Sequence, residues 1–384
     1  MTLTAMLPDG VKDIGPSDAQ LLSSLRTALL NEFELWGYRE VIVPALELTE
    51  STTGAEPRSS RVETYSAEML YRLFDRKGRV LVLRPDITEP VARMACSGPD
   101  VARPQRFSYF GNAFRRRQAG TGQPHEIWQA GFELIGIESP FADAEALMLG
   151  LEALRRAGVE DATGCIGYPA IAASLAPALK RLPPSPIAEL LARMDEWFAA
   201  AEQGHLAHLR CLAGALVRGG VVESFVFDIS LAREMTYYSG PTFEFYSPRA
   251  AGPVAGGGRY DGLCSKFGRD LPATGLAIDV LQVMAVLRKG NERVRDQYTG
   301  TLIGFEEGSE ETAAQLASSL RRAGRVAEVD PLAKNPFDLL KSATAKHRET
   351  ALFVTRQGYQ EFAVAGDLDG LGRRSAEPAA AGVH

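Results

Sequence analysis

The sequence is poor in the residues that build metal centres and disulfide frameworks. It contains four cysteines, Cys96, Cys165, Cys211 and Cys264, and no two of them form a C-x-x-C pair. Zinc sites and dithiol redox centres need such closely spaced ligands, so we expect no metal and no cofactor. Scattered thiols without a framework are typical of a reducing compartment, and we predict a cytoplasmic protein.

Long apolar runs and an excess of positive charge are also missing. The longest apolar stretch, Leu276–Leu287, is interrupted by Asp279 and Gln282 and is too short to span a bilayer. The opening MTLTAMLPDG lacks the charged and apolar regions of a signal peptide. The net charge of −6 provides no overall basic surface for nucleic acid, although a local face could still bind tRNA. We therefore expect neither a membrane nor a nucleic-acid partner.

The composition that remains is that of an ordinary globular protein, with 45% hydrophobic and 23% charged residues. A chain of 384 residues is long enough for about two or three domains. We predict a core formed by residues 1–169 and 221–290, interrupted at 170–220 by an Ala/Leu-rich helical insertion. A small α/β domain is expected at 299–372 and a flexible tail at 373–384.

Periodicity predicts the main elements of the core. A helix beginning near Ser17 carries apolar residues at helical spacing, namely Leu21, Leu25, Leu29, Phe33 and Trp36. A strand at Val41–Val43 should follow it, closed by a proline. Further strands are predicted at Tyr71–Phe74, Val80–Leu83, Phe107–Phe114 and Ile127–Ile137. An amphipathic helix packed on a sheet occurs in many α/β proteins, so these elements alone do not indicate a function.

Four stretches resemble the substrate motifs of class II aminoacyl-tRNA synthetases, most closely histidyl-tRNA synthetase. Leu83–Thr88 (LRPDIT) resembles the family's L-R-P-E-G-T, whose acid and threonine hold the substrate's α-ammonium, which implies that role for Asp86 and Thr88. Phe114–Glu133 resembles motif 2, in which Gln129 and Glu133 match the amino-acid side of the pocket. Ile87 departs from the usual glycine, which changes backbone freedom there.

The third stretch is the most specific match. Leu231–Gly240 (LAREMTYYSG), followed by Phe243-Glu244, resembles the histidine-specific L-V-R-G-L-D-Y-Y-T-G with its trailing F-E. The resemblance implies that Arg233 matches the arginine that assists adenylate formation, and that Tyr237 and Tyr238 help to recognise imidazole. Glu234 and Thr236 depart from this pattern; an acid at position 234 could occupy the neighbouring guanidinium. Gly256–Leu263 (GGGRYDGL) matches G-G-R-Y-D-G-L and adds Tyr260 to the site.

The nucleotide side of these motifs is altered. Arg115 matches the arginine that grips the ATP α-phosphate. However, Arg117 stands where the family has a glutamate that contacts adenine, and Gln123 replaces a basic residue for the γ-phosphate. Ile127 replaces a phenylalanine that stacks on adenine, a contact that contributes on the order of 0.5–1.5 kcal/mol. Gln282 replaces the arginine of motif 3, and a neutral amide cannot substitute for a guanidinium against a triphosphate.

An intact amino-acid side beside an altered ATP side resembles the regulatory subunits of ATP phosphoribosyltransferase, paralogues of histidyl-tRNA synthetase. The resemblance covers residues 7–290. It implies an α+β fold with a class II synthetase-like antiparallel sheet flanked by helices, and a non-catalytic role in histidine biosynthesis. The implied partners are a second copy of the chain, a short-form catalytic subunit in a hetero-octamer, and histidine. The implied histidine-binding residues are Asp86, Thr88, Arg115, Gln129, Glu133, Arg233, Tyr237, Tyr238 and Tyr260.

Two other functions compete with this interpretation. The chain could be an active histidyl-tRNA synthetase or another adenylating enzyme, which the four altered ATP positions oppose, or an amino-acid sensor for an unrelated partner. The sequence also leaves open whether histidine binds in the inherited pocket or at a subunit interface. His205 and His208 have a spacing that can bind metal, but no acidic or cysteine partner is evident in the sequence, so packed or solvated histidines are expected.

Overall fold

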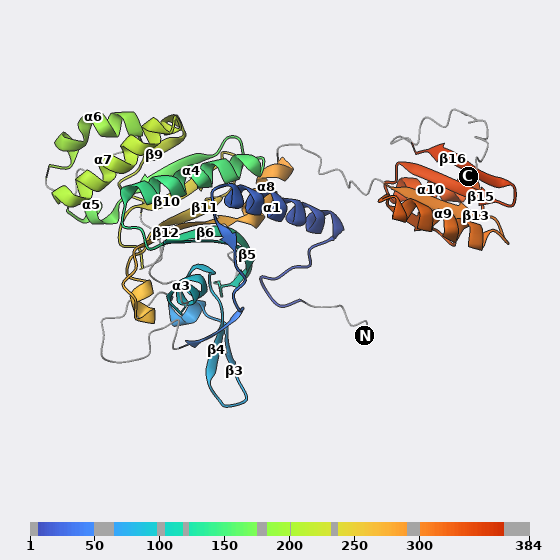
Figure 1. Cartoon of the computed structure of the whole chain (residues 1–384), viewed down its shortest axis with the longest axis horizontal. Helices are drawn as coiled ribbons and strands as arrows, with labels where there is room; N and C mark the ends of the chain where they lie inside the picture. The colour runs from blue at the N-terminus through green and yellow to red at the C-terminus, as the bar shows by residue number, and fades with distance from the viewer. Residues whose placement is uncertain are drawn as a thin grey trace. The chain divides into compact units, whose positions relative to one another are not determined.

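The structure is a computed structural model. It describes residues 7–49, 65–97, 104–117, 123–174, 183–199, 201–231, 237–289 and 300–364 (Figure 1). The chain divides into two compact units, Met1–Glu292 and Arg293–His384, and each is described by itself. The tail predicted to be flexible, 373–384, lies outside the described residues.

Within the described residues, the first unit is built on a nine-stranded sheet with the order β1-β5-β6-β12-β11-β10-β7-β9-β8. Its strands are β1 (Arg39–Glu40), β5 (Gln105–Phe114), β6 (Glu126–Ile135), β7 (Thr163–Gly167), β8 (Ser185–Pro186), β9 (Phe225–Phe227), β10 (Thr242–Tyr246), β11 (Ala255–Arg259) and β12 (Ala273–Asp279). Every pair from β5 to β7 is antiparallel, whereas β1 pairs with β5, and β9 with β7, in parallel. The predicted α+β class and its antiparallel sheet are confirmed.

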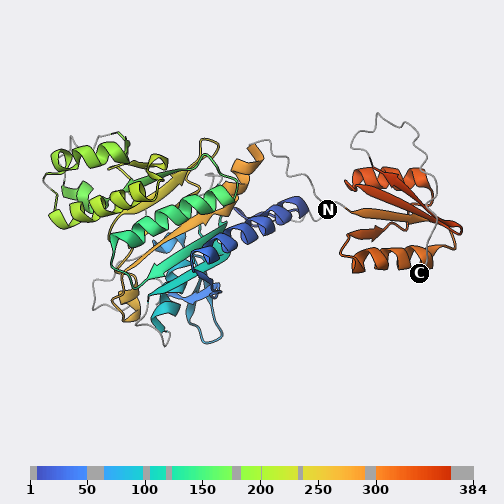
Figure 2. The ribbon, with the colours of Figure 1, turned by 45° about the horizontal axis from the view of Figure 1, so that its top comes forward.

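Three helices, α1 (Pro16–Leu35), α4 (Pro140–Arg156) and α8 (Val280–Lys289), pack on one another and on this sheet (Figure 2). The apolar stripe predicted for α1 is confirmed, since Leu25, Leu29 and Phe33 are buried. Phe33 meets Phe132 of β6 edge-on at 5.2 Å between ring centroids. The helix begins at Pro16, one residue before the predicted start, because proline's fixed φ suits the first helical position.

A smaller sheet lies beside the first in the order β2-β4-β3 and contributes the loop that enters the site. Its strands are β2 (Leu46–Leu48), β3 (Arg72–Phe74) and β4 (Val80–Leu83), followed by α3 (Thr88–Ser97). The strand predicted at Val41–Val43 is wrong: strand pairing ends at Glu40, apart from a bond of 2.8 Å from the Val41 N–H to the Ser108 carbonyl. Pro44 has no N–H with which to continue a ladder, and Leu46–Leu48 joins the smaller sheet instead.

The segment predicted to be a helical insertion carries α5 (Pro169–Ser174), α6 (Ile187–Trp197) and α7 (Gln203–Arg218). Helix α7 packs on α4, and Leu206, Leu209 and Leu216 on its inner face are buried. Short 3-10 turns complete the unit at η1 (Ala67–Met69), η3 (Val222–Ser224) and η4 (Cys264–Phe267).

The second unit is a four-stranded sheet, β14-β13-β15-β16, with a helix packed on each face. Its elements are β13 (Thr301–Phe305), α9 (Glu310–Arg322), β14 (Ala327–Val329), α10 (Pro336–Ala345), β15 (Thr350–Thr355) and β16 (Gly358–Ala363). Consecutive residues of β13 serve opposite faces: Leu302 packs with Leu339 of α10, and Ile303 packs with Ala313 and Ala317 of α9. No helix within the described ranges is long and apolar enough to cross a membrane.

Candidate functional site

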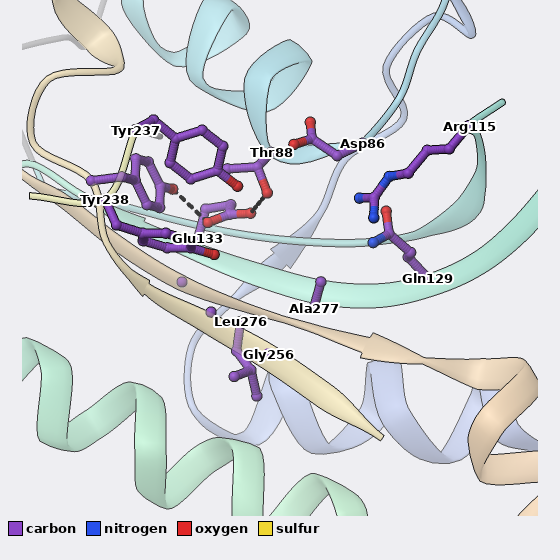
Figure 3. Close-up of a pocket in the computed structure, with 13 residues that line it drawn as sticks. Asp86, Thr88, Arg115, Gln129, Glu133, Tyr237, Tyr238, Gly256, Leu276 and Ala277 are labelled. Atoms are coloured by element: carbon purple, nitrogen blue, oxygen red, sulfur yellow. Dashed lines mark hydrogen bonds between the residues drawn. The ribbon is translucent and has the colours of Figure 1, made fainter. Parts of the chain in front are cut away.

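A cavity opens in the first unit, over β6, β11 and β12 (Figure 3). Its empty space is about 370 Å³ when the part open to solvent is included. The structure brings together eight of the nine predicted site residues on its wall, namely Asp86, Thr88, Arg115, Gln129, Glu133, Tyr237, Tyr238 and Tyr260. The ninth, Arg233, lies outside the described residues, as do the departures at 234 and 236.

Asp86 is placed by the start of α3. Its Oδ1 accepts a hydrogen bond of 3.1 Å from the Glu89 N–H, which is the N-cap interaction that aspartate favours. Its Oδ2 is buried and has no hydrogen-bond partner among the described residues. Burial raises the pKa of Asp86, while the charge of Arg115 opposes that rise. One carboxylate oxygen therefore holds the helix and the other is left for a donor in the cavity.

Glu133 is the centre of the buried polar network. It is 1% exposed. Its Oε1 accepts hydrogen bonds from Thr88 at 2.7 Å and Tyr109 at 3.2 Å, and its Oε2 accepts one from Tyr260 at 2.5 Å. Burial raises the pKa of Glu133 to about 8, against the lowering effect of these hydroxyl donors. Because a carboxylate offers about four acceptor positions, the three hydroxyls leave one, on Oε2.

Glycines make the room for this carboxylate. Gly275 of β12 lies directly opposite Glu133 of β6 in the sheet. A Cβ at position 275 would fall 1.8 Å from the Glu133 Oε2, and one at Gly257 would fall 2.0 Å from the Gly275 carbonyl oxygen. A side chain at position 275 would therefore collide with the Glu133 carboxyl, and one at position 257 would collide with the backbone of β12.

Tyrosines form the wall next to Glu133. The rings of Tyr237 and Tyr238 are 4.7 Å apart between centroids, and Tyr237 meets Tyr260 edge-on at 5.8 Å. Burial raises the pKa of Tyr237 and of Tyr260 well above the usual value, so both keep neutral hydroxyls. This wall can pack against a flat ring and donate hydrogen bonds to it.

The opposite end of the cavity is charged. Figure 3 shows Asp86, Arg115 and Gln129 at one end and Glu133 with Tyr237 and Tyr238 at the other. Arg115 is anchored by a bond of 2.7 Å from its Nε to the Pro85 carbonyl. The Gln129 Oε1 is buried and, like the Asp86 Oδ2, has no hydrogen-bond partner in the part of the chain that the structure describes. The cavity thus offers acceptors for an ammonium and a guanidinium for a carboxylate.

The altered nucleotide positions lie apart from this cavity. Arg117, Gln123, Ile127 and Gln282 are absent from its lining. Ile127 is buried, and the N–H of Gln282 donates to Asp279 Oδ1 at 3.0 Å at the start of α8. Burial raises the pKa of Asp279, against the charges of the two arginines at 115 and 117 and the N–H groups of the helix. None of the four replaced positions therefore borders the cavity.

Sequence reasoning missed Tyr109 as a member of the network. Phe107 lies opposite Glu133 in the β5–β6 hairpin, and Tyr109 is two residues further along β5. Because side chains two apart on a strand share a face, the alternation of the predicted hairpin contained the signal. The Gly256–Leu263 motif also carries more than was predicted, because Arg259 beside Tyr260 bonds to Asp143, on the side away from the cavity.

Comparisons with known proteins agree with this geometry. A family model described as histidyl-tRNA synthetase matches residues 10–196 and 178–283. The chain is 34% identical, over 88% of its length and 94% of the relative's, to the ATP phosphoribosyltransferase regulatory subunit of Symbiobacterium thermophilum. It is 32% identical to that of Moorella thermoacetica, over 84% of its length and 89% of the relative's.

Solved structures show the same relationship. A structure from Bacillus halodurans C, described as an ATP phosphoribosyltransferase regulatory subunit/histidyl-tRNA synthetase, aligns with a TM-score of 0.75 and 28% identity, covering 92% of this chain and 99% of that one. Apo histidyl-tRNA synthetase from S. aureus aligns with a TM-score of 0.72 and 19% identity, covering 94% and 98%, which shows the shared fold. The chain therefore belongs to the family of ATP phosphoribosyltransferase regulatory subunits, which have the fold of histidyl-tRNA synthetase.

Proposed function

We propose that this chain is the non-catalytic regulatory subunit of a short-form ATP phosphoribosyltransferase, acting at the first step of histidine biosynthesis, and that its cavity binds histidine as the feedback signal. The observation that carries the ligand is the pair of buried, unpartnered acceptors at one end of the cavity, with one open acceptor position on Glu133 at the other. A ligand that pairs all three acceptors must carry hydrogen-bond donors at both of its ends.

The charged end suits the backbone of an amino acid. An ammonium has three donors, and two of them can reach Asp86 Oδ2 and Gln129 Oε1. Leaving such an acceptor buried and unpaired costs about 1–3 kcal/mol, so a ligand that pairs both acceptors recovers that free energy. Arg115 is the natural partner of the ligand's carboxylate, since it lines the same end of the cavity.

The aromatic end suits an imidazole. A neutral imidazole has one N–H donor and one acceptor nitrogen. The donor matches the remaining acceptor position on the Glu133 Oε2, and the acceptor matches a tyrosine hydroxyl, for which we select Tyr238. Gly275 keeps the space beside Oε2 open. Arg233, which lies outside the described residues, stays a predicted site residue.

We also propose that the chain forms a dimer through the segment that follows α1 and the smaller sheet. Large apolar side chains are exposed on both: Ile42 is 89% exposed, and Leu46, Leu73 and Phe74 are exposed on β2 and β3, Phe74 to 76%. Exposed apolar groups gathered on neighbouring segments are typical of an interface. The α1 stripe is buried within its own chain, so the adjoining segment supplies the contact.

The four thiols are unpaired, which supports a cytoplasmic location.

Co-expression with a short-form catalytic subunit tests this proposal. We expect the two chains to purify together, the assembly to be larger than the dimer, and its activity to fall when histidine is added. Titration calorimetry on the isolated chain then separates the two places where histidine could bind: heat of binding without the catalytic subunit indicates the cavity. Inhibition of the assembly without any binding to the isolated chain would place the sensor at the subunit interface.

A matched pair of variants sharpens the test. Glu133→Gln replaces the cavity carboxyl by an amide, whereas Glu89→Gln does the same to another buried carboxyl, whose pKa burial also raises to about 8 but which does not line the cavity. Only Glu133→Gln should abolish the heat of histidine binding. Equal loss in both variants would show that a general electrostatic or folding effect is responsible.

A further inference from the structure

A second buried polar cluster, which we call the junction, lies outside the cavity, where three elements meet. It consists of Asp143 on α4, Arg259 at the end of β11 and His208 on α7. The Asp143 side chain is fully buried, and its Oδ2 accepts both a bond of 2.9 Å from the Arg259 Nε and a bond of 2.7 Å from the His208 Nε2. The acidic partner that sequence reasoning did not find for His208 is thus 65 residues away in the chain.

We propose that the junction positions Tyr260 in the ligand cavity. The packing of the helical segment α5–α7 against the core then controls the affinity of the cavity for its ligand. This inference rests on the proposed function for the identity of the ligand. It concerns the regulation of the same site.

Arg259 is held from several sides. Its Nη2 donates to the Ser139 carbonyl at 3.0 Å, and its Nη1 donates to Asp261 Oδ1 at 3.1 Å and to the Ile137 carbonyl at 3.3 Å. Ser139 is the N-cap of α4. The guanidinium therefore fixes the end of β11 against the start of α4, and its side chain is 5% exposed. A buried arginine held by single hydrogen bonds to four different residues leaves its backbone little freedom.

The next residue along the chain carries that restraint into the cavity. Tyr260 follows Arg259 directly and donates its hydroxyl hydrogen bond of 2.5 Å to the Glu133 Oε2. The Arg259 carbonyl also accepts the Ser239 N–H at 2.8 Å, and Ser239 follows the Tyr237-Tyr238 pair. Both ends of the tyrosine wall are thus tied to one arginine. Because the ligand is assigned the last acceptor position on Oε2, the place of the Tyr260 hydroxyl decides whether that position is open.

His208 connects this arrangement to the helical segment. Its ring packs edge-on against Tyr168 at 5.9 Å, and its side chain is 19% exposed. His208 and Arg259 share one oxygen of Asp143, whose other oxygen, Oδ1, has no hydrogen-bond partner among the described residues. Movement of α7 away from α4 would remove one of the two donors on Oδ2 and leave the carboxylate free to turn. The contact of Arg259 with Asp143, and the chain at Tyr260, would change with it.

Variants of two neighbouring histidines test the coupling. His208→Phe keeps a ring against Tyr168 but removes the donor to Asp143, and His208→Gln restores a donor. His205→Phe is the matched control, since His205 also packs on Tyr168, at 5.3 Å, and makes no bond to Asp143. We expect His208→Phe to weaken histidine binding in calorimetry by about 5- to 20-fold, within the usual range of coupling between sites, and His208→Gln to recover most of it. His205→Phe should change the affinity less than about twofold.

A double-mutant cycle with Tyr260→Phe asks whether the effect passes through Tyr260. His208 and Tyr260 do not touch in any contact that the structure gives, so a purely structural role predicts additive effects. If the junction acts by positioning Tyr260, His208→Phe should have little further effect on histidine affinity in a protein that already carries Tyr260→Phe. Additive losses, or equal losses in His208→Phe and His205→Phe, would overturn the proposal.

A measurement on the ligand-free protein distinguishes the proposed role of the junction from the proposed binding of histidine. The Tyr260 hydrogen bond lowers the pKa of Glu133, so displacement of that hydroxyl in His208→Phe should move the titration of Glu133 upward. Carboxyl-¹³C glutamate labelling, with Glu133→Gln to identify the signal, measures this in the ligand-free protein. If the wild type binds no histidine, the proposed function fails while this titration still decides the junction. An unchanged Glu133 titration in a folded His208→Phe variant would overturn the junction's role, and Asp143→Asn gives a second variant should the first not fold.

Discussion

The two halves of the motif region behave in opposite ways. On the amino-acid side, one cavity is lined by Asp86, Thr88, Gln129 and Glu133. Thr88 donates a hydrogen bond to Glu133, whereas Asp86 Oδ2 and Gln129 Oε1 are buried acceptors without a partner among the described residues. On the nucleotide side, the replaced residues do not line that cavity, and Asp279 bonds to the first turn of α8. The described residues thus form a buried polar network on the amino-acid side, and the four replaced positions of the nucleotide motifs lie outside its cavity.

This contrast explains how a synthetase fold can serve as a regulatory subunit. Adenylation needs contacts to both substrates in one transition state, whereas sensing needs only the amino acid. Four replacements on one side therefore remove the chemistry without touching the pocket on the other side. The following predictions test that division, in order of decreasing expected effect.

Glu133→Ala should have the largest effect. It removes the acceptor for the imidazole N–H, a charge-assisted hydrogen bond of roughly 1.5–3 kcal/mol, and it leaves the buried hydroxyls of Thr88, Tyr109 and Tyr260 without their acceptor. Histidine inhibition of the assembled enzyme should weaken by about 10- to 150-fold, while activity without histidine changes little. The inhibition curve is measured beside the melting temperature. Full inhibition in a well-folded Glu133→Ala variant would move the sensor to the subunit interface.

Asp86→Asn should have the next largest effect. The amide oxygen can still cap α3, but the charge that attracts the ligand's ammonium is gone, so we expect roughly tenfold weaker histidine binding with an unchanged melting temperature. Imidazolepropionate, which lacks the amine, provides the control: it should bind weakly and equally well to wild type and variant. A similar loss for both ligands would show that Asp86 does not contact the ammonium.

The stability of the ligand-free chain should depend on pH through the cavity carboxyl. The pKa of Glu133 is about 8 in the folded chain, above its value of about 4.3 in an unfolded chain. The folded state therefore holds a proton that the unfolded state releases, and this contribution to the free energy of unfolding is complete below pH ~4.3 and falls by about 1.4 kcal/mol per pH unit up to pH ~8. The free energy of unfolding, measured by urea denaturation at pH 5.5, 6.5 and 7.5, should fall less steeply with pH in Glu133→Gln than in wild type. An equal pH dependence in the two proteins would contradict the prediction.

The nucleotide side should give the smallest signal. We expect histidine-dependent exchange of pyrophosphate into ATP at background level, because the matched contacts to adenine and the γ-phosphate are missing. Gln282→Arg and Ile127→Phe, alone or together, should not raise it, since Arg117 and Asp279 still occupy that side. Histidine-dependent exchange that survives purification would reopen the synthetase interpretation.

Short-range signals in the sequence predicted much of this site, and long-range partners were the part that could not be predicted. Resemblance to the short motifs of histidyl-tRNA synthetase located Asp86, Glu133 and Tyr238, because each lies within a contiguous stretch that matches the family. The Asp143–His208 bond joins residues 65 apart, and no local pattern encodes it. The same limit applies to the edge of the sheet, where the Val41–Val43 pattern favours a strand but the available partner strand decides where pairing ends.

The second unit shows which kinds of helix and edge strand are difficult to predict from the sequence. The small α/β unit expected near the C-terminus contains a four-stranded sheet and helices α9 and α10. No bounds were predicted for helix α10 or strand β16, because Pro336 and the turn at Arg356–Gly358 look like loop residues in isolation. Proline at a first helical position and glycine in a hairpin turn acquire their structural role only when the sheet beneath them is known.

The hydroxyl network around Glu133 also has an evolutionary consequence. Thr88, Tyr109 and Tyr260 converge on one buried carboxyl, and Gly275 leaves the space for it. A single substitution in this group leaves a buried polar atom without its hydrogen-bond partner or forces a collision. Mutational paths that change the group therefore pass through less stable intermediates. The pocket should therefore diverge slowly among descendants of this chain, more slowly than the nucleotide side, even in a lineage where histidine had ceased to be the signal. Another small molecule could then inherit a pocket that folding, rather than sensing, had preserved.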